Sequence, residues 1–176
     1  MTRLNFLTPE EIKISSEFKK NGFIIRDAAN KKSLNWIQSK FVNLIKKEYN
    51  FEKNITNLKI LNFIHKKISK SNLNSFRLKI YNSINKDPNY KYHYFEVARP
   101  FIEAIAGNEL AMQKKVNLSI QLPGDDSSLL SVHSDVWAGD SPFEIVVWIP
   151  LVNCFKTKTM YILPPNKNEK FNKKVS

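Results

Sequence analysis

Apolar residues in the first two thirds of the chain recur at helical spacing. Leu34, Ile37, Phe41 and Ile45 fall on one side of a helix, and lysines occupy the other side. Similar spacing predicts further helices over residues 58–68, 73–84 and 90–105, the last interrupted near Pro100. The pattern therefore indicates a helical region over residues 1–113, and its apolar stripes indicate a core.

A helix start lies near the N-terminal end of this region. Thr8 is a capping residue, Pro9 suits a first turn, and Glu11 is placed for a capping box. We expect the helix to end at Gly22, and Phe23–Ile25 to form a short strand.

The pattern changes after residue 113. Residues 117–122 alternate polar and apolar side chains, residues 123–128 are rich in turn formers, and residues 143–152 form a β-branched and aromatic run. This order is typical of a jelly-roll barrel. The sequence therefore predicts an α+β fold in a single domain over residues 1–165, with strands over 114–165 and a polar, lysine-rich tail over 166–176.

Between the two strand-like runs stands His133-Ser134-Asp135. Side chains two apart on an extended segment point to the same side, so both can reach one ion. A neutral imidazole and a carboxylate favour a divalent transition metal over calcium or magnesium. They are two thirds of the two-His, one-carboxylate triad of non-haem Fe(II) oxygenases.

The surrounding residues resemble a known family. Residues 107–113, 118–128 and 132–144, followed by Lys158–Pro165, are similar to the 2-oxoglutarate/Fe(II) oxygenases found sporadically in bacterial carbohydrate biosynthesis clusters, within the phytanoyl-CoA dioxygenase-like superfamily. The resemblance implies a double-stranded β-helix, of jelly-roll and cupin-like type, with Fe(II) and 2-oxoglutarate as cofactors. It also implies hydroxylation of a carbohydrate or a surface-polysaccharide precursor, a small-molecule substrate.

The resemblance also suggests supporting residues. A hydroxyl about two dozen residues after the metal-binding His contacts 2-oxoglutarate in related oxygenases, which fits Thr159 or Thr157. Asn117 and Gln121 share a strand face and are candidates to bind 2-oxoglutarate or substrate, or to be solvated. The loop residues expected to bind substrate are Trp137 and Asp140.

One ligand of the triad is missing. No histidine follows His133, and neither the resemblance nor the helical surroundings give His65 or His93 a ligand role. The chain looks truncated at its C-terminus relative to the family, which carries the distal His and a basic 2-oxoglutarate anchor further on. We therefore expect slow turnover or none.

Two alternatives stay open. The chain is then either a non-catalytic remnant or binding domain, or a metal-free cupin-like sugar epimerase that uses His133 and Asp135 for proton transfer. A hydrolase triad with Ser127 or Ser128 is disfavoured because no Gly-x-Ser-x-Gly motif is present.

The net charge of +12 raises the question of nucleic-acid binding. Residues 1–113 carry 20 basic and 10 acidic side chains, whereas residues 114–165 carry 4 and 5. Only four of the 28 basic residues are arginine, the residue that reads guanine edges and phosphates best. We therefore expect no nucleic-acid partner.

The remaining sequence features concern the localisation of the protein and residues with structural roles. No run is long enough for a membrane span and no signal peptide is recognisable, so we expect a cytoplasmic protein. Cys154 is the single cysteine and is expected to be buried. Arg77 and Arg99 fit ion pairs better than anion sites, and the aromatic residues over 90–95 fit packing better than sugar stacking.

Overall fold

The computed structural model describes residues 6–167, and its regular elements are helices. Its α-helices are α1 (Pro9–Asn21), α2 (Lys31–Glu48), α3 (Asn57–Phe63), α4 (Lys70–Asn85) and α5 (Pro88–Ala106). Its short 3₁₀ turns are η1 (Ile64–Lys66), η2 (Asp126–Ser128), η3 (Asp135–Ala138), η4 (Lys156–Lys158) and η5 (Pro165–Lys167).

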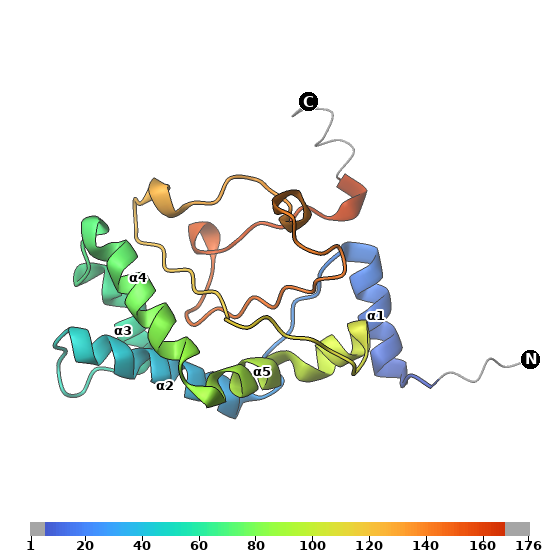
Figure 1. Cartoon of the computed structure of the whole chain (residues 1–176), viewed down its shortest axis with the longest axis horizontal. Helices are drawn as coiled ribbons and strands as arrows, with labels where there is room; N and C mark the ends of the chain where they lie inside the picture. The colour runs from blue at the N-terminus through green and yellow to red at the C-terminus, as the bar shows by residue number, and fades with distance from the viewer. Residues whose placement is uncertain (1–5, 168–176) are drawn as a thin grey trace, which may run out of the picture.

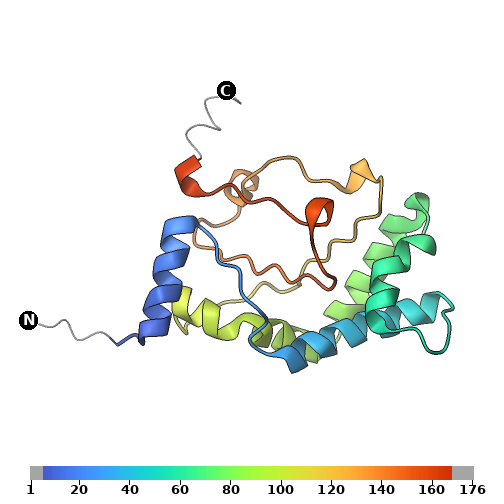
Figure 2. The ribbon, with the colours of Figure 1, turned by 180° about the vertical axis from the view of Figure 1, so that it is seen from behind.

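The helices form a curved layer around the rest of the chain. Helices α2 and α5 pack along each other, α1 packs on α5 at one end, and α3 and α4 pack on α2 at the other end. Both views show the segment after α5 running through the hollow of this layer (Figure 1, Figure 2). The long segment after α5 therefore lies against helices on several sides.

The predicted start and end of α1 are confirmed. The hydroxyl of Thr8 accepts a hydrogen bond from the Glu11 N–H, and the Glu11 carboxylate accepts one from the Thr8 N–H, which is the capping box. Hydrogen bonds from the Thr8 N–H and from the Thr8 hydroxyl to the Glu11 carboxylate lower the pKa of Glu11, because they favour its charged form. Gly22 ends the helix with a φ of 76°, a left-handed conformation that glycine adopts without strain.

Replacing Thr8 by alanine is expected to lower the free energy of unfolding by about 1 kcal/mol, because the Glu11 N–H loses its hydroxyl partner and the Glu11 carboxylate loses the hydrogen bond from that hydroxyl. Urea unfolding followed by circular dichroism measures this loss. Ser16→Ala, on an exposed site of the same helix, is the control and should change stability by less than about 0.5 kcal/mol. Equal stability of Thr8→Ala and wild type would contradict a functional capping box.

The apolar stripe of α2 lies in the core, as its spacing predicts. Ile37, Phe41 and Ile45 are buried on one face. They meet buried residues of α3 and α4, and those of α5. The buried partners from these three helices are Ile60, Leu73, Phe76, Ile80, Ile84, Tyr90 and Val97.

The helices expected over residues 58–68 and 73–84 are confirmed as α3 with η1 and as α4. The interruption expected near Pro100 is wrong, because α5 continues through Pro100 to Ala106. An interior proline costs a helix about 3 kcal/mol. Buried residues on both sides of Pro100, Val97 and Ala104, hold the helix against the core despite that cost.

The predicted strands are wrong. In the part of the chain that the structure describes there is no β-strand, so the α+β prediction with an incomplete jelly-roll, cupin-like double-stranded β-helix is overturned and the fold is all-α. The short strand expected over Phe23–Ile25 is also absent; these residues form part of the link between α1 and α2.

The alternation of side chains nevertheless has a structural counterpart. Over residues 116–122 the even positions are buried or half-buried and the odd positions are exposed, and over 145–151 the odd positions are half-buried and the even ones exposed. One face of each segment packs on the helical core. Alternation thus predicted which side faces the helices, but a strand also needs a neighbour at hydrogen-bonding distance, which alternation alone does not specify.

The boundary between the helical region and the remainder lies close to its predicted place, since α5 ends at Ala106. The predicted tail over 166–176 falls mostly outside the described residues, which end at Lys167 in η5.

Candidate metal-binding pair

His133 and Asp135 lie together on a loop between the two extended segments. The loop is not a strand, because Asp135 begins the 3₁₀ turn η3. The two side chains still face each other, with the Nε2 atom of His133 3.6 Å from Oδ1 of Asp135. The structure therefore brings the predicted pair together by a turn instead of by strand alternation.

The spacing of the two atoms suits a shared ion. Two ligands about 2.1 Å from one metal lie about 3.0 Å apart at a right angle and about 3.4 Å apart at the tetrahedral angle. The observed 3.6 Å is only slightly longer. A small side-chain rotation brings both donors into coordinating range.

A backbone contact orients the imidazole. Nδ1 of His133 lies 2.7 Å from the carbonyl oxygen of Ser131, which can only accept a hydrogen bond. Nδ1 therefore carries a proton, and in the neutral imidazole the lone pair is then on Nε2, the nitrogen that faces Asp135. Metal-binding histidines commonly have this arrangement, with the second ring nitrogen donating to a carbonyl or carboxylate.

Backbone hydrogen bonds close the loop around Asp135. The N–H of Trp137 donates to the Ser134 carbonyl, and the N–H of Asp140 donates to the Asp135 carbonyl. Gly139 ends η3 at a φ of 99°, which favours glycine. This turn fixes the Asp135 backbone, so the point on the backbone from which the Asp135 carboxylate extends has a defined position.

The pair is open to solvent. About half of each side chain is accessible, 46% for His133 and 54% for Asp135. Among residues 6–167 no group of three or more His, Cys, Asp or Glu side chains could hold a metal. An ion bound here would therefore keep several positions for water or a small chelating ligand.

The residues predicted to bind 2-oxoglutarate make no hydrogen bond to the pair among the described residues. The hydroxyl of Thr159 donates to the Met160 carbonyl. Gln121 donates to the Ser128 carbonyl, and Asn117 is exposed. Trp137 is exposed beside Asp135, and Asp140 follows at the end of the same loop, so these two remain next to the metal pair.

A buried polar network at the 123–128 turn was missed by the sequence analysis. Asp125 is buried and accepts hydrogen bonds from the hydroxyls of Ser127 and Ser128. Arg77 of α4 donates to the Ser128 hydroxyl and to the Ile120 carbonyl, and its Nε is buried without a partner among the described residues. The Asp-x-Ser-Ser sequence is a turn signal that could have revealed the local half of this network.

Residues considered above for a hydrolase triad or an anion site belong to this network. Ser127 and Ser128 bond Asp125 and make no hydrogen bond to His133 among the described residues, so the hydrolase arrangement does not form. Arg77 fastens the turn to α4 by hydrogen bonds to neutral groups, and the ion pair expected for it is absent among the described residues. Arg99 pairs with Glu96 and Glu103 on the surface of α5.

The network predicts an acid-sensitive contribution to stability. Hydrogen bonds from Ser127 and Ser128 lower the pKa of Asp125 below its ordinary value of 3.8. A carboxylate with a lowered pKa stabilises the fold above its unfolded pKa, and that stability is lost as the pH falls through the folded pKa. We expect Asp125→Ala to lower the urea midpoint clearly at pH 6, and by less at an acidic pH well below 3.8. Asp126→Ala, an exposed neighbour, is the control. An equal loss at both pH values would contradict the role of the charged carboxylate.

The remaining histidines serve the helices. His93 of α5 bonds the Ser33 hydroxyl through Nδ1 at 3.0 Å and stacks on Trp36, with ring centroids 4.2 Å apart. His65 lies in η1 with Nδ1 3.1 Å from the Asn62 carbonyl. Neither contributes to the His133 loop.

The aromatic residues over 90–95 act mainly in packing. Tyr90 is buried, and burial raises its pKa. Tyr94 donates its hydroxyl to the Val147 carbonyl and so ties α5 to the second extended segment.

Cys154 is half-buried, and burial raises the pKa of its thiol, which disfavours the reactive thiolate.

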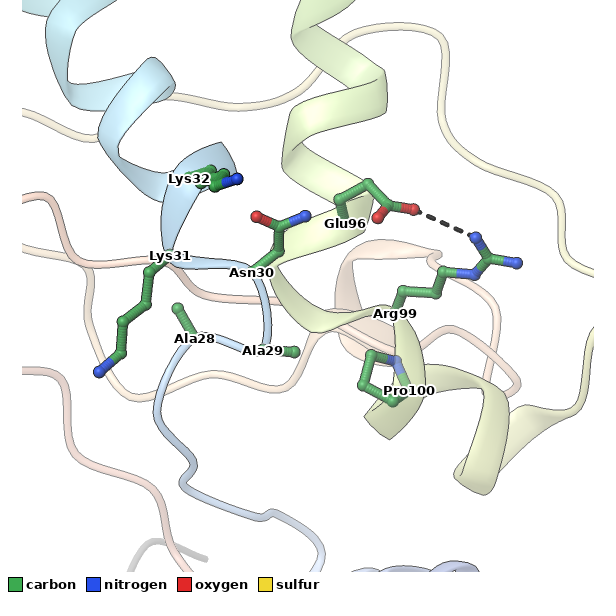
Figure 3. Close-up of a pocket in the computed structure, with 8 residues that line it drawn as sticks. All are labelled: Ala28, Ala29, Asn30, Lys31, Lys32, Glu96, Arg99 and Pro100. Atoms are coloured by element: carbon green, nitrogen blue, oxygen red, sulfur yellow. Dashed lines mark hydrogen bonds and ion pairs between the residues drawn. The ribbon is translucent and has the colours of Figure 1, made fainter.

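A shallow cavity of about 490 Å³ lies elsewhere, between the start of α2 and the middle of α5. Figure 3 shows that Arg99 turns to Glu96 and that Lys31 and Lys32 extend in different directions. None of the predicted site residues lines it, so it does not belong to the metal-binding pair.

Comparisons with known proteins return no match to a family model, to a curated protein or to a solved structure. Within the described residues, no helix is both long enough and apolar enough to cross a membrane.

Proposed function

We propose that this chain binds Fe(II) through His133 and Asp135 and, with 2-oxoglutarate, is a non-haem oxygenase of weak activity. The observation that carries the proposal is the orientation of the two donors. Nε2 of His133 faces Oδ1 of Asp135 at 3.6 Å while Nδ1 is held by the Ser131 carbonyl. A carbohydrate-linked substrate follows only from the resemblance of the residues around the pair to carbohydrate-cluster oxygenases.

The donor set supports a transition metal. One imidazole nitrogen and one carboxylate oxygen are typical ligands of Fe(II), whereas calcium and magnesium prefer oxygen ligands alone. Iron with 2-oxoglutarate supplies the oxidising chemistry in such enzymes. The residues of this chain would have the simpler tasks of binding the ion through His133 and Asp135 and orienting the imidazole through Ser131, with Trp137 and Asp140 on the same loop.

The same geometry explains why we expect slow turnover. Two protein ligands bind an ion less tightly than three, and solvent reaches about half of each ligand. Loss of even a group that only orients a ligand costs 10- to 100-fold in metal affinity or activity, as an order of magnitude. Fe(II) should therefore bind weakly, and 2-oxoglutarate should be decarboxylated slowly.

An anaerobic Fe(II) titration followed by a 2-oxoglutarate decarboxylation assay tests the proposal. We expect binding of one ion per chain, and slow release of CO₂ that falls to background in Asp135→Ala. The matched control is Asp126→Ala, which removes an exposed carboxylate from another loop of the same region. Fe(II) binding that survives Asp135→Ala would contradict the proposal.

The openness of the pair favours a second candidate, a non-catalytic binding domain. A half-exposed pair without a third protein ligand among residues 6–167 can bind an ion without enclosing a substrate. Fe(II) binding that depends on Asp135, with no 2-oxoglutarate decarboxylation above background, would favour this candidate over the oxygenase.

A further inference from the structure

Residues 145–149 form an extended segment without helix or turn, and only the Val147 carbonyl of its backbone has a hydrogen-bond partner among the described residues (Figure 1). Its N–H groups donate no hydrogen bond to another residue of the described chain. The carbonyl oxygen of Val147 accepts a hydrogen bond from the Tyr94 hydroxyl of α5. In an extended chain the N–H and C=O of one residue point to the same edge, and those of the next residue point to the opposite edge. The free edge is therefore the one that carries the peptide groups of Val146 and Trp148.

The outer face of this segment is apolar. Val146 is 61% exposed and Trp148 is 44% exposed, whereas Val147 and its odd-numbered neighbours face the helices. A free edge beside exposed β-branched and aromatic side chains is a template for pairing with another strand.

Large apolar side chains are exposed throughout residues 130–161, the region that contains this segment. Trp137, Phe143 and Tyr161 are 69%, 92% and 84% exposed, and Leu130 is 80% exposed. With about 150–250 Å² per aromatic side chain, these rings and Trp148 expose several hundred Å². A standard interface covers about 800 Å² on each partner.

Charge favours a second copy of the chain as that partner. Residues 114–165 carry 4 basic and 5 acidic side chains, whereas residues 1–113 carry 20 and 10. Two copies that meet through this nearly neutral region bring little net charge together at the contact. An acidic partner would instead be attracted to the helices.

The sequence of the segment is self-complementary. Antiparallel pairing centred on Val147 places Val146 opposite Trp148 of the second copy, and Trp148 opposite its Val146. Aromatic and β-branched residues form favourable cross-strand pairs. In this register Val146 and Trp148 of the two copies form the hydrogen-bonded pairs, through the peptide groups of the free edge. The register also has the twofold symmetry of a closed dimer.

We propose that residues 145–149 pair with the same segment of a second copy, forming an antiparallel two-stranded ribbon across a symmetric dimer. The occupant is this chain itself, and the pairing does not involve His133 or Asp135.

Sedimentation velocity of the full chain across micromolar concentrations tests the proposal. We expect a dimer for the wild type and a monomer for the double variant Val146→Lys, Trp148→Lys, with an unchanged helical circular dichroism spectrum. Leu78→Lys alters an equally exposed apolar site on α4 and should remain dimeric. A monomeric wild type, an open-ended aggregate, or a folded double variant that stays dimeric would overturn the proposal.

Amide hydrogen exchange of the wild type gives a test that needs no variant. The N–H groups of Val146 and Trp148 should exchange at least ~10-fold more slowly at high protein concentration than at low concentration. Concentration-independent exchange at both positions would overturn the proposed pairing, even if the chain dimerises by another surface.

Discussion

Replacing His133 by alanine is expected to lower the affinity for Fe(II) by at least about 100-fold, since the loss of groups that merely orient a ligand already costs 10- to 100-fold. The variant removes Nε2, the donor that faces Asp135 at 3.6 Å. Isothermal titration calorimetry under anaerobic conditions measures the change. Because His133 is exposed, the fold should be unaffected, and thermal unfolding of the metal-free protein checks this.

His65→Ala is the matched control for this experiment. It removes an imidazole of the helical region that contacts the Asn62 carbonyl, and Fe(II) affinity should stay within about twofold of the wild type. A comparable loss of affinity in both variants would indicate nonspecific binding by histidines. An unchanged affinity in His133→Ala would contradict the assigned pair.

Replacing Phe76 by alanine is expected to lower the free energy of unfolding by about 3–5 kcal/mol, the usual cost of deleting a buried phenylalanine ring. Phe76 is 6% exposed on α4 and packs on Tyr49, with ring centroids 5.7 Å apart. The loss is large against the ~5–15 kcal/mol that stabilises a typical domain. Urea unfolding followed at 222 nm measures it.

Leu78→Ala gives the comparison on the same helix. Leu78 is 51% exposed, so its truncation should cost less than about 1 kcal/mol. If the two variants were equally stable, α4 would not pack as described, and the placement of Arg77 and the 123–128 turn would fail with it.

The helices could be predicted because their signals are local. The Thr8 and Glu11 capping box lies within four residues, and the stripe from Ile37 to Ile45 lies on one helix face. The passage of α5 through Pro100 could not be predicted in this way, since it depends on packing of Val97 and Ala104 against distant residues.

The missing strands have a similar explanation. Alternation over residues 117–122 reports which side chains face an apolar layer, and here that layer is helical. Whether two extended segments form a ladder depends on their separation in space, which is set by contacts distant in sequence. The hydrogen bond between Arg77 and Ser128, 51 residues apart, is such a contact.

Only the part of the candidate site whose residues are close in sequence could be predicted. The spacing of His133 and Asp135 is two residues, so either an extended or a turn conformation can bring them together. The contact of Nδ1 with Ser131 was not visible in the residue pattern, because a backbone carbonyl carries no sequence signature. The expectation for Thr159 and Asn117 depended on a barrel to bring them near the pair, and the described residues form no such barrel.

A long-range ¹H–¹⁵N spectrum of the three histidine side chains, recorded before and after addition of Zn²⁺, tests the metal-binding pair most directly. Zn²⁺ is a diamagnetic probe with similar preferences for imidazole and carboxylate. We predict that His133 is protonated at Nδ1 in the free protein. On addition of Zn²⁺ the Nε2 signal of His133 should shift, whereas the signals of His65 and His93 should stay unchanged. An unchanged His133, or equal shifts of all three residues, would contradict the assignment of His133 and Asp135 as a metal-binding pair.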